Sequence, residues 1–232
     1  LGVPANEAER QLLAPYPDAV APDVMDGTYV PAKTDGSGRD RKEMKRAFDI
    51  LTDKGFSIKD EKMQDAKGNV LSFEILTRSV AEERLGLAYK RTLERLGIGV
   101  TIRTVDDAQY QKRLETFDYD MILGAYSGSL SPGFEQFRRW SSQFRDINGS
   151  FNYAGVADAA VDALIGKMLS ARKQNEFVGT VRALDRVLMS GNYFVPIYFQ
   201  PSQWVARWTH IKHPDKTSLN GYQFTTWWSD KK

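Results

Sequence analysis

Between residues 71 and 125, strand-like and helix-like spacings of apolar residues alternate along the chain. This alternation limits the fold more than any other feature of the sequence. Apolar and polar residues alternate over 71–77 and 100–105, and a short apolar run covers 119–125, as expected for β-strands. Apolar residues at helical spacing separate these strands over 81–96 and 108–116. Strands joined by helices in this way form right-handed βαβ units. The sequence therefore predicts an α/β fold, with a mostly parallel sheet flanked by helices and these three strands adjacent.

Three regions of the chain differ in composition. Residues 1–40 hold five of the nine prolines and little periodicity, so we expect an extended segment that packs on the rest of the chain, with a helix at most over 7–13. Residues 41–194 are expected to form the α/β lobe. Residues 195–232 contain four of the five tryptophans, Trp204, Trp208, Trp227 and Trp228. Leu1 is not an initiator Met and no signal-peptide pattern follows it, so we expect the chain to be part of a longer protein.

Further elements are predicted outside the strand–helix alternation. Helical spacing continues over 41–54, where Gly55 can end the helix, and over 135–144, 160–168 and 177–188. Residues 195–199 have the composition of a strand, and Pro196 assigns that strand to an edge or a bulge.

Composition excludes several classes of function. The 32 Lys and Arg residues and the 30 Asp and Glu residues are interspersed and leave a net charge of +2. A nucleic-acid-binding protein concentrates its positive charge, so we expect no nucleic-acid partner. The absence of cysteine excludes disulfides, Cys-based zinc sites and thiol catalysis. No segment approaches the roughly 20 apolar residues that span a bilayer as a helix.

No arrangement of residues typical of an enzyme is found in the sequence. His210 and His213 are the only histidines, Pro214 follows them, and zinc requires three or four ligands. No G-x-S-x-G motif is present, and Gly97-x-Gly99 follows a helix and opens a strand, the reverse of a phosphate-binding loop. We expect no catalytic residue, no metal, no cofactor and no enzymatic activity. An α/β enzyme domain is the less favoured alternative, and a partner-binding module built on the Trp-rich tail is another.

The loop over residues 126–133 has the composition of a ligand-binding site. It follows the strand predicted over 119–125 at its carboxyl end, where open α/β sheets bind their ligands. Its glycines and hydroxyl side chains allow close approach to the backbone, and Arg139 can receive a carboxylate or a phosphate. A plain connecting loop is the alternative. The candidate ligand contacts are Tyr126, Ser127, Ser129, Leu130, Ser131, Pro132, Gln136, Arg139, Asn152 and Tyr153.

Short segments, in order along the whole chain, resemble the family 5 solute-binding proteins of peptide and nickel ABC importers. They are Gly27–Pro31, Thr34–Gly36, Lys54–Phe56, Leu71–Leu76, Leu96–Val100, Phe117–Met121 and Val195–Phe199. Within this family the chain resembles the Yej branch, which imports oligopeptides and peptide–nucleotide antibiotics of the microcin C type. The segments that carry this narrower resemblance are Ser129–Gly133 with Glu135 and Gln136, Asn152–Gly155 and Ala183–Leu188.

The resemblance implies a bilobal protein with a class II (cluster C) fold that clamps its ligand between two α/β lobes. This chain corresponds to the second lobe, with residues 195–232 returning toward the N-terminal lobe. The implied partners are a peptide or peptide-like ligand, that N-terminal lobe and the permease subunits of an ABC transporter. The implied location is the periplasm. A non-peptide solute, such as an opine, a glycoside or a nickel complex, is the alternative ligand within the family.

The chain departs from the family at one point. Oligopeptide binders place an Asp after a Trp in the ligand loop, where it holds the ammonium group of the peptide. Residues 124–129 contain neither Asp nor Trp. We therefore do not expect a free peptide N-terminus to be recognised by that device.

Overall fold

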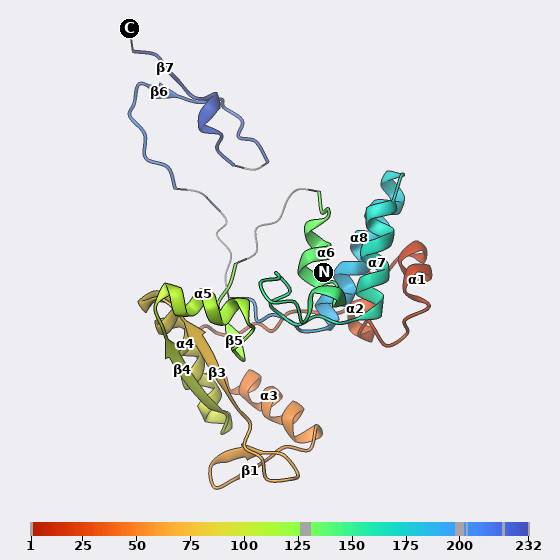
Figure 1. Ribbon diagram of the computed structural model, residues 1–232, viewed down its shortest axis with the longest axis vertical. Coiled ribbons are helices and arrows are strands. Elements are labelled where there is room, and N and C mark those ends of the chain that lie inside the picture. Colours follow the sequence, from red (N-terminus) through yellow and green to blue (C-terminus); the bar gives the residue numbers. More distant parts are fainter. Residues whose placement is uncertain (1, 126–130, 198–201, 203, 220, 232) are drawn as a thin grey trace. The chain divides into compact units, whose positions relative to one another are not determined.

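The computed structural model describes residues 2–125, 131–197, 202, 204–219 and 221–231 (Figure 1). The chain divides into two units. The first comprises residues 1–127 and 133–193, and the second comprises residues 128–132 and 194–232. The first unit contains the parallel sheet and helices α1–α8, and it has two separate hydrophobic cores.

The parallel sheet has the strand order β4-β3-β5. Strand β3 (Ser72–Thr77) lies between β4 (Gly99–Thr104) and β5 (Met121–Ile122), and both neighbours run parallel to it. In this register Ile75 of β3 lies beside Ile102 and Met121. The α/β fold and the adjacency of the three predicted strands are confirmed. The third strand is shorter than predicted, because only two of its residues pair with β3.

Two helices connect the three strands, and both begin at capped residues. The first, α4 (Val80–Leu93), is capped by the Ser79 side chain and continues into the 3-10 helix η1 (Glu94–Leu96). The second, α5 (Asp107–Glu115), is capped by the Asp106 side chain. Helix α4 packs closely on β4 at Gly86, where an added Cβ would lie 3.1 Å from the Ile102 side chain. The small side chain therefore allows the helix to approach the sheet.

A helix and a hairpin precede the parallel sheet in the chain, and both contribute side chains to the first hydrophobic core. Helix α3 (Arg41–Asp53) begins at Asp40, whose carboxylate accepts the backbone N–H groups of Lys42 and Glu43. Strands β1 (Ser57–Lys59) and β2 (Lys62–Gln64) form an antiparallel hairpin. The first hydrophobic core lies beneath them, and its buried members are Met63, Ile75, Leu96, Ile98 and Val100.

The second hydrophobic core is entirely helical. It joins α1 (Glu7–Leu13), α2 (Pro22–Asp26), α6 (Glu135–Trp140), α7 (Ala159–Ser170) and α8 (Gln174–Ser190). Its buried centre includes Leu13, Trp140, Val161, Leu164, Ile165 and Leu184. The predicted helix 135–144 is broken at Ser141, which has an extended backbone, and resumes as the 3-10 helix η2 (Ser142–Phe144).

Arg186 of α8 fastens the first residues of the chain to this helical core. Its Nε donates to the carboxylate of Glu9 at 2.8 Å, and its terminal nitrogens donate to the carbonyl oxygens of Val24 and Val3. Glu9 is buried, so an unpaired charge there would be costly. The segment Ala183–Leu188, which carried part of the resemblance to the Yej branch, thus has a structural role at Arg186.

The second unit contains little regular structure. Strands β6 (Ile211–Lys212) and β7 (Trp228–Ser229) pair antiparallel, and the 3-10 helix η3 (Phe224–Thr226) lies between them in sequence. The prediction of a strand over 195–199 is wrong for residues 195–197, which are exposed and form no strand. Pro196 lacks a backbone N–H, and no described segment pairs with these residues. Residues 198 and 199 lie outside the described part of the chain.

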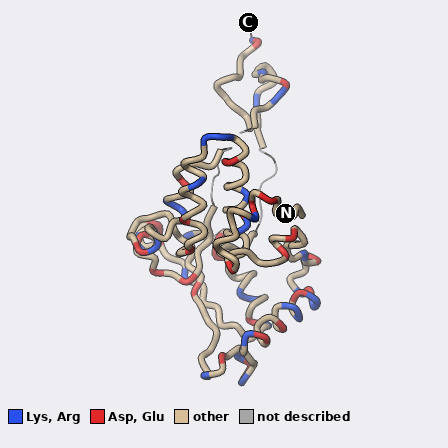
Figure 2. Tube along the Cα trace, turned by 90° about the vertical axis from the view of Figure 1, so that its right-hand side faces the viewer, with Lys and Arg blue, Asp and Glu red and all other residues tan. Residues whose placement is uncertain are grey.

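Basic and acidic residues are interspersed along the chain (Figure 2). Helix α3, for example, carries both signs, and Lys45 pairs with Asp49 one turn away at 2.7 Å. Among the described residues, none of the helices has the length and apolar character needed to cross a membrane.

Candidate ligand-binding site at the carboxyl edge of the sheet

The carboxyl ends of the strands bring Thr77, Thr104 and Leu123 to one edge of the sheet. The hydroxyl groups of Thr77 and Thr104 lie 2.9 Å apart across β3 and β4, and Thr77 is fully buried. The chain continues from Leu123 into the predicted ligand loop. Open α/β sheets bind ligands at this edge, so the loop begins where the fold favours a site.

Four of the predicted contacts in this loop, Tyr126, Ser127, Ser129 and Leu130, lie outside the described residues. The two that are described, Ser131 and Pro132, are exposed and half-buried respectively. Both belong to the second unit of the chain. Their contact with a ligand remains a prediction.

Arg78 is a candidate that the sequence analysis missed. It directly follows the central strand β3. Its backbone N–H and its Nε both donate to the Glu82 carboxylate, at 2.9 and 3.4 Å, and its guanidinium carbon lies 5.0 Å from the centre of the Tyr110 ring. Its side chain is still 52% exposed. A guanidinium held on one side by a carboxylate and an aromatic ring is pre-oriented to bind an anionic or carbonyl group.

Tyr110 of α5 connects this edge to the end of β5. Its hydroxyl donates to the carbonyl oxygen of Leu123 at 3.3 Å, and the residue is buried. Burial, together with the nearby Glu82 carboxylate, raises the pKa of the Tyr110 hydroxyl. The phenol therefore stays neutral and keeps its donor at physiological pH.

Helix α6 carries two of the predicted contacts, and both are partly buried. Gln136 already uses its amide, because its Oε1 accepts from the Trp140 indole at 2.8 Å and its Nε2 donates to Glu135 at 3.3 Å. Arg139 is the penultimate residue of α6 and is half-buried. The structure does not contradict a ligand contact by Gln136 or Arg139, and both contacts remain predictions.

The structure corrects the role of Asn152. Its side chain is fully buried, and its amide nitrogen donates to the carbonyl oxygens of Ser141 and Val156 at 3.1 and 2.8 Å. Its amide oxygen accepts the backbone N–H of Val156. Both amide hydrogens are used within the protein, so Asn152 holds the 141–156 segment together and we remove it from the ligand contacts.

Tyr153, the neighbouring candidate, is only half-buried. Its ring meets the Phe151 ring edge to face at 6.0 Å, and its carbonyl oxygen accepts the Tyr119 hydroxyl at 2.9 Å. Burial raises the pKa of the Tyr153 hydroxyl, which therefore remains neutral. Tyr153 lines a pocket against α5, and its contact with a ligand of the predicted loop remains a prediction.

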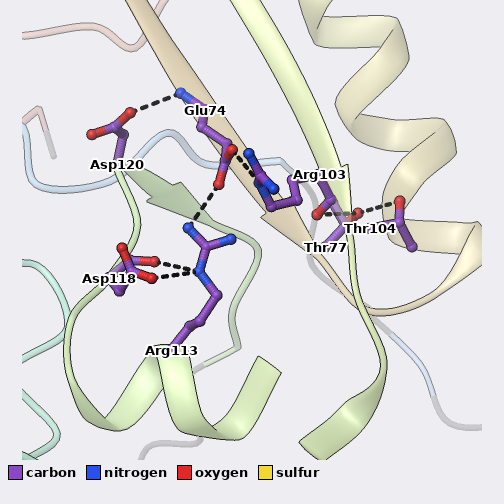
Figure 3. Close-up of polar contacts among 7 residues, drawn as sticks. All are labelled: Glu74, Thr77, Arg103, Thr104, Arg113, Asp118 and Asp120. Atoms are coloured by element: carbon purple, nitrogen blue, oxygen red, sulfur yellow. Dashed lines mark hydrogen bonds and ion pairs between the residues drawn. The ribbon is translucent and has the colours of Figure 1, made fainter. Parts of the chain in front are cut away.

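A charged network fixes α5 and the start of β5 against β3 (Figure 3). The carboxylate of Glu74 accepts Nε of Arg103 at 2.5 Å and a terminal nitrogen of Arg113 at 2.8 Å. Arg113 also donates to Asp118, and Asp120 accepts the backbone N–H of Glu74 at 2.8 Å. Desolvation alone would raise the pKa of Glu74, but the hydrogen bonds from Arg103 and Arg113 outweigh it and hold the pKa below its usual value.

The histidines form no metal site with the other described residues. His213 Nδ1 lies 2.8 Å from the Pro214 carbonyl oxygen, and the His210 ring stacks on Trp208 at 6.5 Å. No group of three His, Cys, Asp or Glu side chains in the described part of the chain has the geometry to hold a metal ion.

This α/β fold occurs in solved solute-binding proteins, and the chain belongs to the bacterial extracellular solute-binding proteins of family 5. The family model, described as its middle part, matches residues 4–148. A putative binding protein of Brucella melitensis is 60% identical over 98% of the chain. The peptidoglycan-binding protein YepA and the probable peptide-binding protein YejA, both of Agrobacterium fabrum, are 48% and 34% identical over 98% and 99% of the chain.

The chain spans 37–38% of the length of these relatives. Its fold matches that of the oligopeptide-binding protein AppA of Bacillus subtilis, solved with a nonapeptide, with a TM-score of 0.63 and 16% identity. That match covers 97% of this chain and 45% of AppA. The predicted family, and its fold as one part of a larger binding protein, are confirmed.

Proposed function

We propose that this chain is the C-terminal lobe of a periplasmic solute-binding protein that captures oligopeptides or peptide-like compounds and delivers them to the permease of an ABC transporter. Within it, residues 41–194 form the ligand-binding lobe, residues 1–40 pack on that lobe, and residues 195–232 return toward the N-terminal lobe. The protein binds and releases its ligand without chemical turnover.

The observation that carries this proposal is the pre-oriented Arg78 at the carboxyl edge of the sheet. Its guanidinium contacts the Glu82 carboxylate and the Tyr110 ring and is still half-exposed, and Tyr110 in turn bonds to Leu123 at the end of β5. A peptide offers carbonyl oxygens and a carboxylate, and a guanidinium binds both kinds of group. The names of two relatives, a peptide-binding and a peptidoglycan-binding protein, support ligands that contain peptide.

A second candidate ligand class is a solute without peptide bonds. Structures with the same fold include one of Campylobacter jejuni NikZ with a nickel–histidine complex and one of a Thermotoga maritima protein with mannohexaose. Both are below 20% identical to this chain, so they support the fold and leave the ligand open. Titration of the full-length protein with peptides, a nickel–histidine complex and an oligosaccharide separates the two classes.

The proposal is tested by calorimetry on the full-length protein with a pool of tri- to hexapeptides. We expect peptide binding, and we expect Arg78→Gln to weaken it roughly tenfold, or about 1.4 kcal/mol, because a charged hydrogen bond is lost. Arg46→Gln is the matched control, since Arg46 is also exposed and pairs with a glutamate, Glu43, within its own helix.

Absence of peptide binding in the wild type would refute the function. Equal affinities of wild type and Arg78→Gln would refute the role of Arg78. Peptides recovered intact by mass spectrometry would agree with the absence of turnover.

A further inference from the structure

A pocket of about 260 Å³ lies between helix α5 and the segment 148–153. Besides Leu114, Thr116, Gly149 and Ser150, its lining includes side chains of three kinds: aromatic rings, amides and a pair of opposite charges. These are Phe151 and Tyr153, Gln111 and Asn148, and Lys112 and Glu115. None of them except Tyr153 was among the predicted ligand contacts.

Hydrogen bonds fix the walls of this pocket, and they come from the backbone and from some of the lining side chains. The backbone N–H of Gly149 donates to the carbonyl oxygen of Glu115 at 2.8 Å, which ties the segment to the end of α5. The buried Ser150 hydroxyl donates to the carbonyl oxygen of Phe144 at 2.6 Å. Gln111 donates to one oxygen of the Glu115 carboxylate at 3.2 Å, so one polar wall is also held in place.

The aromatic wall is equally well held. The Phe151 ring meets the Tyr153 ring nearly perpendicularly, at 78°, and the Arg138 guanidinium lies 4.7 Å from its centre. Phe151 is nevertheless 41% exposed. A large aromatic ring held by a cation and a second ring, yet open to solvent, is suited to stack on the apolar face of a ligand.

The charge of the lining restricts the class of ligand. Lys112 and Glu115 lie on the same helix and oppose each other in sign, so a phosphate would meet a carboxylate and a polyamine would meet an ammonium group. A neutral group that both donates and accepts hydrogen bonds satisfies both signs, and hydroxyl groups do so. The volume lies below the roughly 300–1,000 Å³ of pockets that enclose whole ligands, so it suits a single ring.

We propose that this pocket binds a neutral saccharide ring, with the apolar face of the sugar on Phe151 and its hydroxyl groups on Gln111, Asn148 and Glu115. The lining of this pocket includes none of Arg78, Glu82 and Tyr110, so the sugar site and the Arg78 site use different residues. The pocket therefore adds a sugar-binding activity that stands whether or not the peptide proposal holds.

The test uses the full-length protein and two probes, N-acetylglucosamine and glucose, with saturation-transfer NMR at millimolar sugar. We expect transfer to at least one sugar in the wild type. We expect that signal to fall several-fold in Phe151→Ala and in Asn148→Ala. Phe134→Ala is the matched control, because Phe134 is an exposed aromatic residue outside the pocket, and it should keep the full signal.

Asn148→Ala changes an exposed side chain in a loop and is expected to leave the fold intact, which guards against misfolding of Phe151→Ala. Absence of transfer to both sugars in the wild type would overturn the proposal, as would transfer that survives both pocket variants. Loss of signal in Phe134→Ala to the same extent would also overturn it. Calorimetry with the peptide pool should give the same affinity for Asn148→Ala as for the wild type, because Asn148 is not among the candidate peptide contacts, and this distinguishes the two sites.

Discussion

At the scale of single residues, Glu74 determines how firmly α5 and the start of β5 are held against the central strand. Its carboxylate receives two arginines from different elements, Arg103 of β4 and Arg113 of α5, and its side chain is only 17% exposed. Arg113 in turn holds Asp118, just before β5. Removing the central carboxylate leaves Arg113 with one acidic partner in a partly buried place, so the cost exceeds that of a surface ion pair.

We therefore predict that Glu74→Gln lowers the free energy of unfolding by roughly 1–3 kcal/mol at pH 7, the usual worth of hydrogen bonds to a charged group. Because the pKa of Glu74 is depressed in the folded state, its stabilisation is complete above the unfolded pKa of about 4.3. It is lost as the pH falls through the lower folded pKa. Urea unfolding at several pH values should show the gap between wild type and variant closing below about pH 4.

Glu61→Gln serves as the control for this experiment, because Glu61 is an exposed glutamate in the β1–β2 turn. It should change stability little at any pH. A gap between wild type and Glu74→Gln that stays constant from pH 7 to pH 3 would contradict the assigned role of the Glu74 charge.

Individual site residues were the least predictable part of this molecule. From the sequence, Asn152 was predicted to contact the ligand. In the structure its amide is fully buried and donates to the carbonyl oxygens of Ser141 and Val156. Arg78 could not be identified from the sequence because the orientation of its guanidinium depends on Tyr110. Tyr110 lies 32 positions later in the chain and contacts Arg78 only in the folded protein. Contacts of this kind cannot be predicted from the sequence pattern, because neither periodicity nor spacing indicates which distant side chains meet at an edge of a sheet.

At the scale of elements, most helices were predicted well because they carry apolar spacing and, in several cases, a capping residue at the start. Helix α2 (Pro22–Asp26) was not predicted, because it lies in the proline-rich segment that was expected to be extended. Asp40, Ser79, Asp106 and Asp158 all cap the helices that follow them. The predicted strand is absent from residues 195–197 for the converse reason, because a strand depends on a neighbour that its own sequence does not specify. The short length of β5 has the same origin, since pairing with β3 sets its bounds.

Helix α8 lacks the cap that these helices have. Its N-cap residue, Lys173, has the extended backbone of a cap (φ −114°, ψ 143°) but makes no side-chain hydrogen bond to the first turn. Glu176 stands three residues later, so Lys173→Ser would create the S-x-x-E capping box. We predict that this substitution raises the free energy of unfolding by about 0.5–1 kcal/mol, measured by chemical denaturation.

The substitution also removes the ion pair between Lys173 and Glu176, but that pair is exposed, 3.7 Å long and of little worth. Lys167→Ser, inside helix α7, is the matched control and should lower stability by a few tenths of a kcal/mol, because serine is the poorer helix former. If Lys173→Ser were as destabilising as Lys167→Ser, the residue would not act as a cap.

At the scale of the whole molecule, the C-terminal tail, residues 195–232, exposes several large apolar side chains among its described residues. Trp204 is 93% exposed, Trp208 76%, Leu219 88% and Phe224 67%. Aromatic side chains bury large areas when covered, and extended apolar patches on monomers mark interaction sites. The chain spans 37% of the length of its Brucella melitensis relative, so additional polypeptide in a full-length protein is the natural candidate for that cover.

We therefore predict that the chain of residues 1–232 binds a fluorescent hydrophobic dye, or self-associates, several-fold more strongly than the full-length protein at equal molar concentration. The double substitution Trp204→Ser with Trp208→Ser should reduce dye fluorescence of the short chain, because it removes the two most exposed tryptophans. The same double substitution in the full-length protein should leave dye binding low and instead reduce stability, since it would remove buried contacts with the N-terminal lobe. Dye fluorescence and analytical ultracentrifugation on both lengths decide the matter. Equal dye binding by the short and full-length proteins would mean that the N-terminal lobe does not cover the tail.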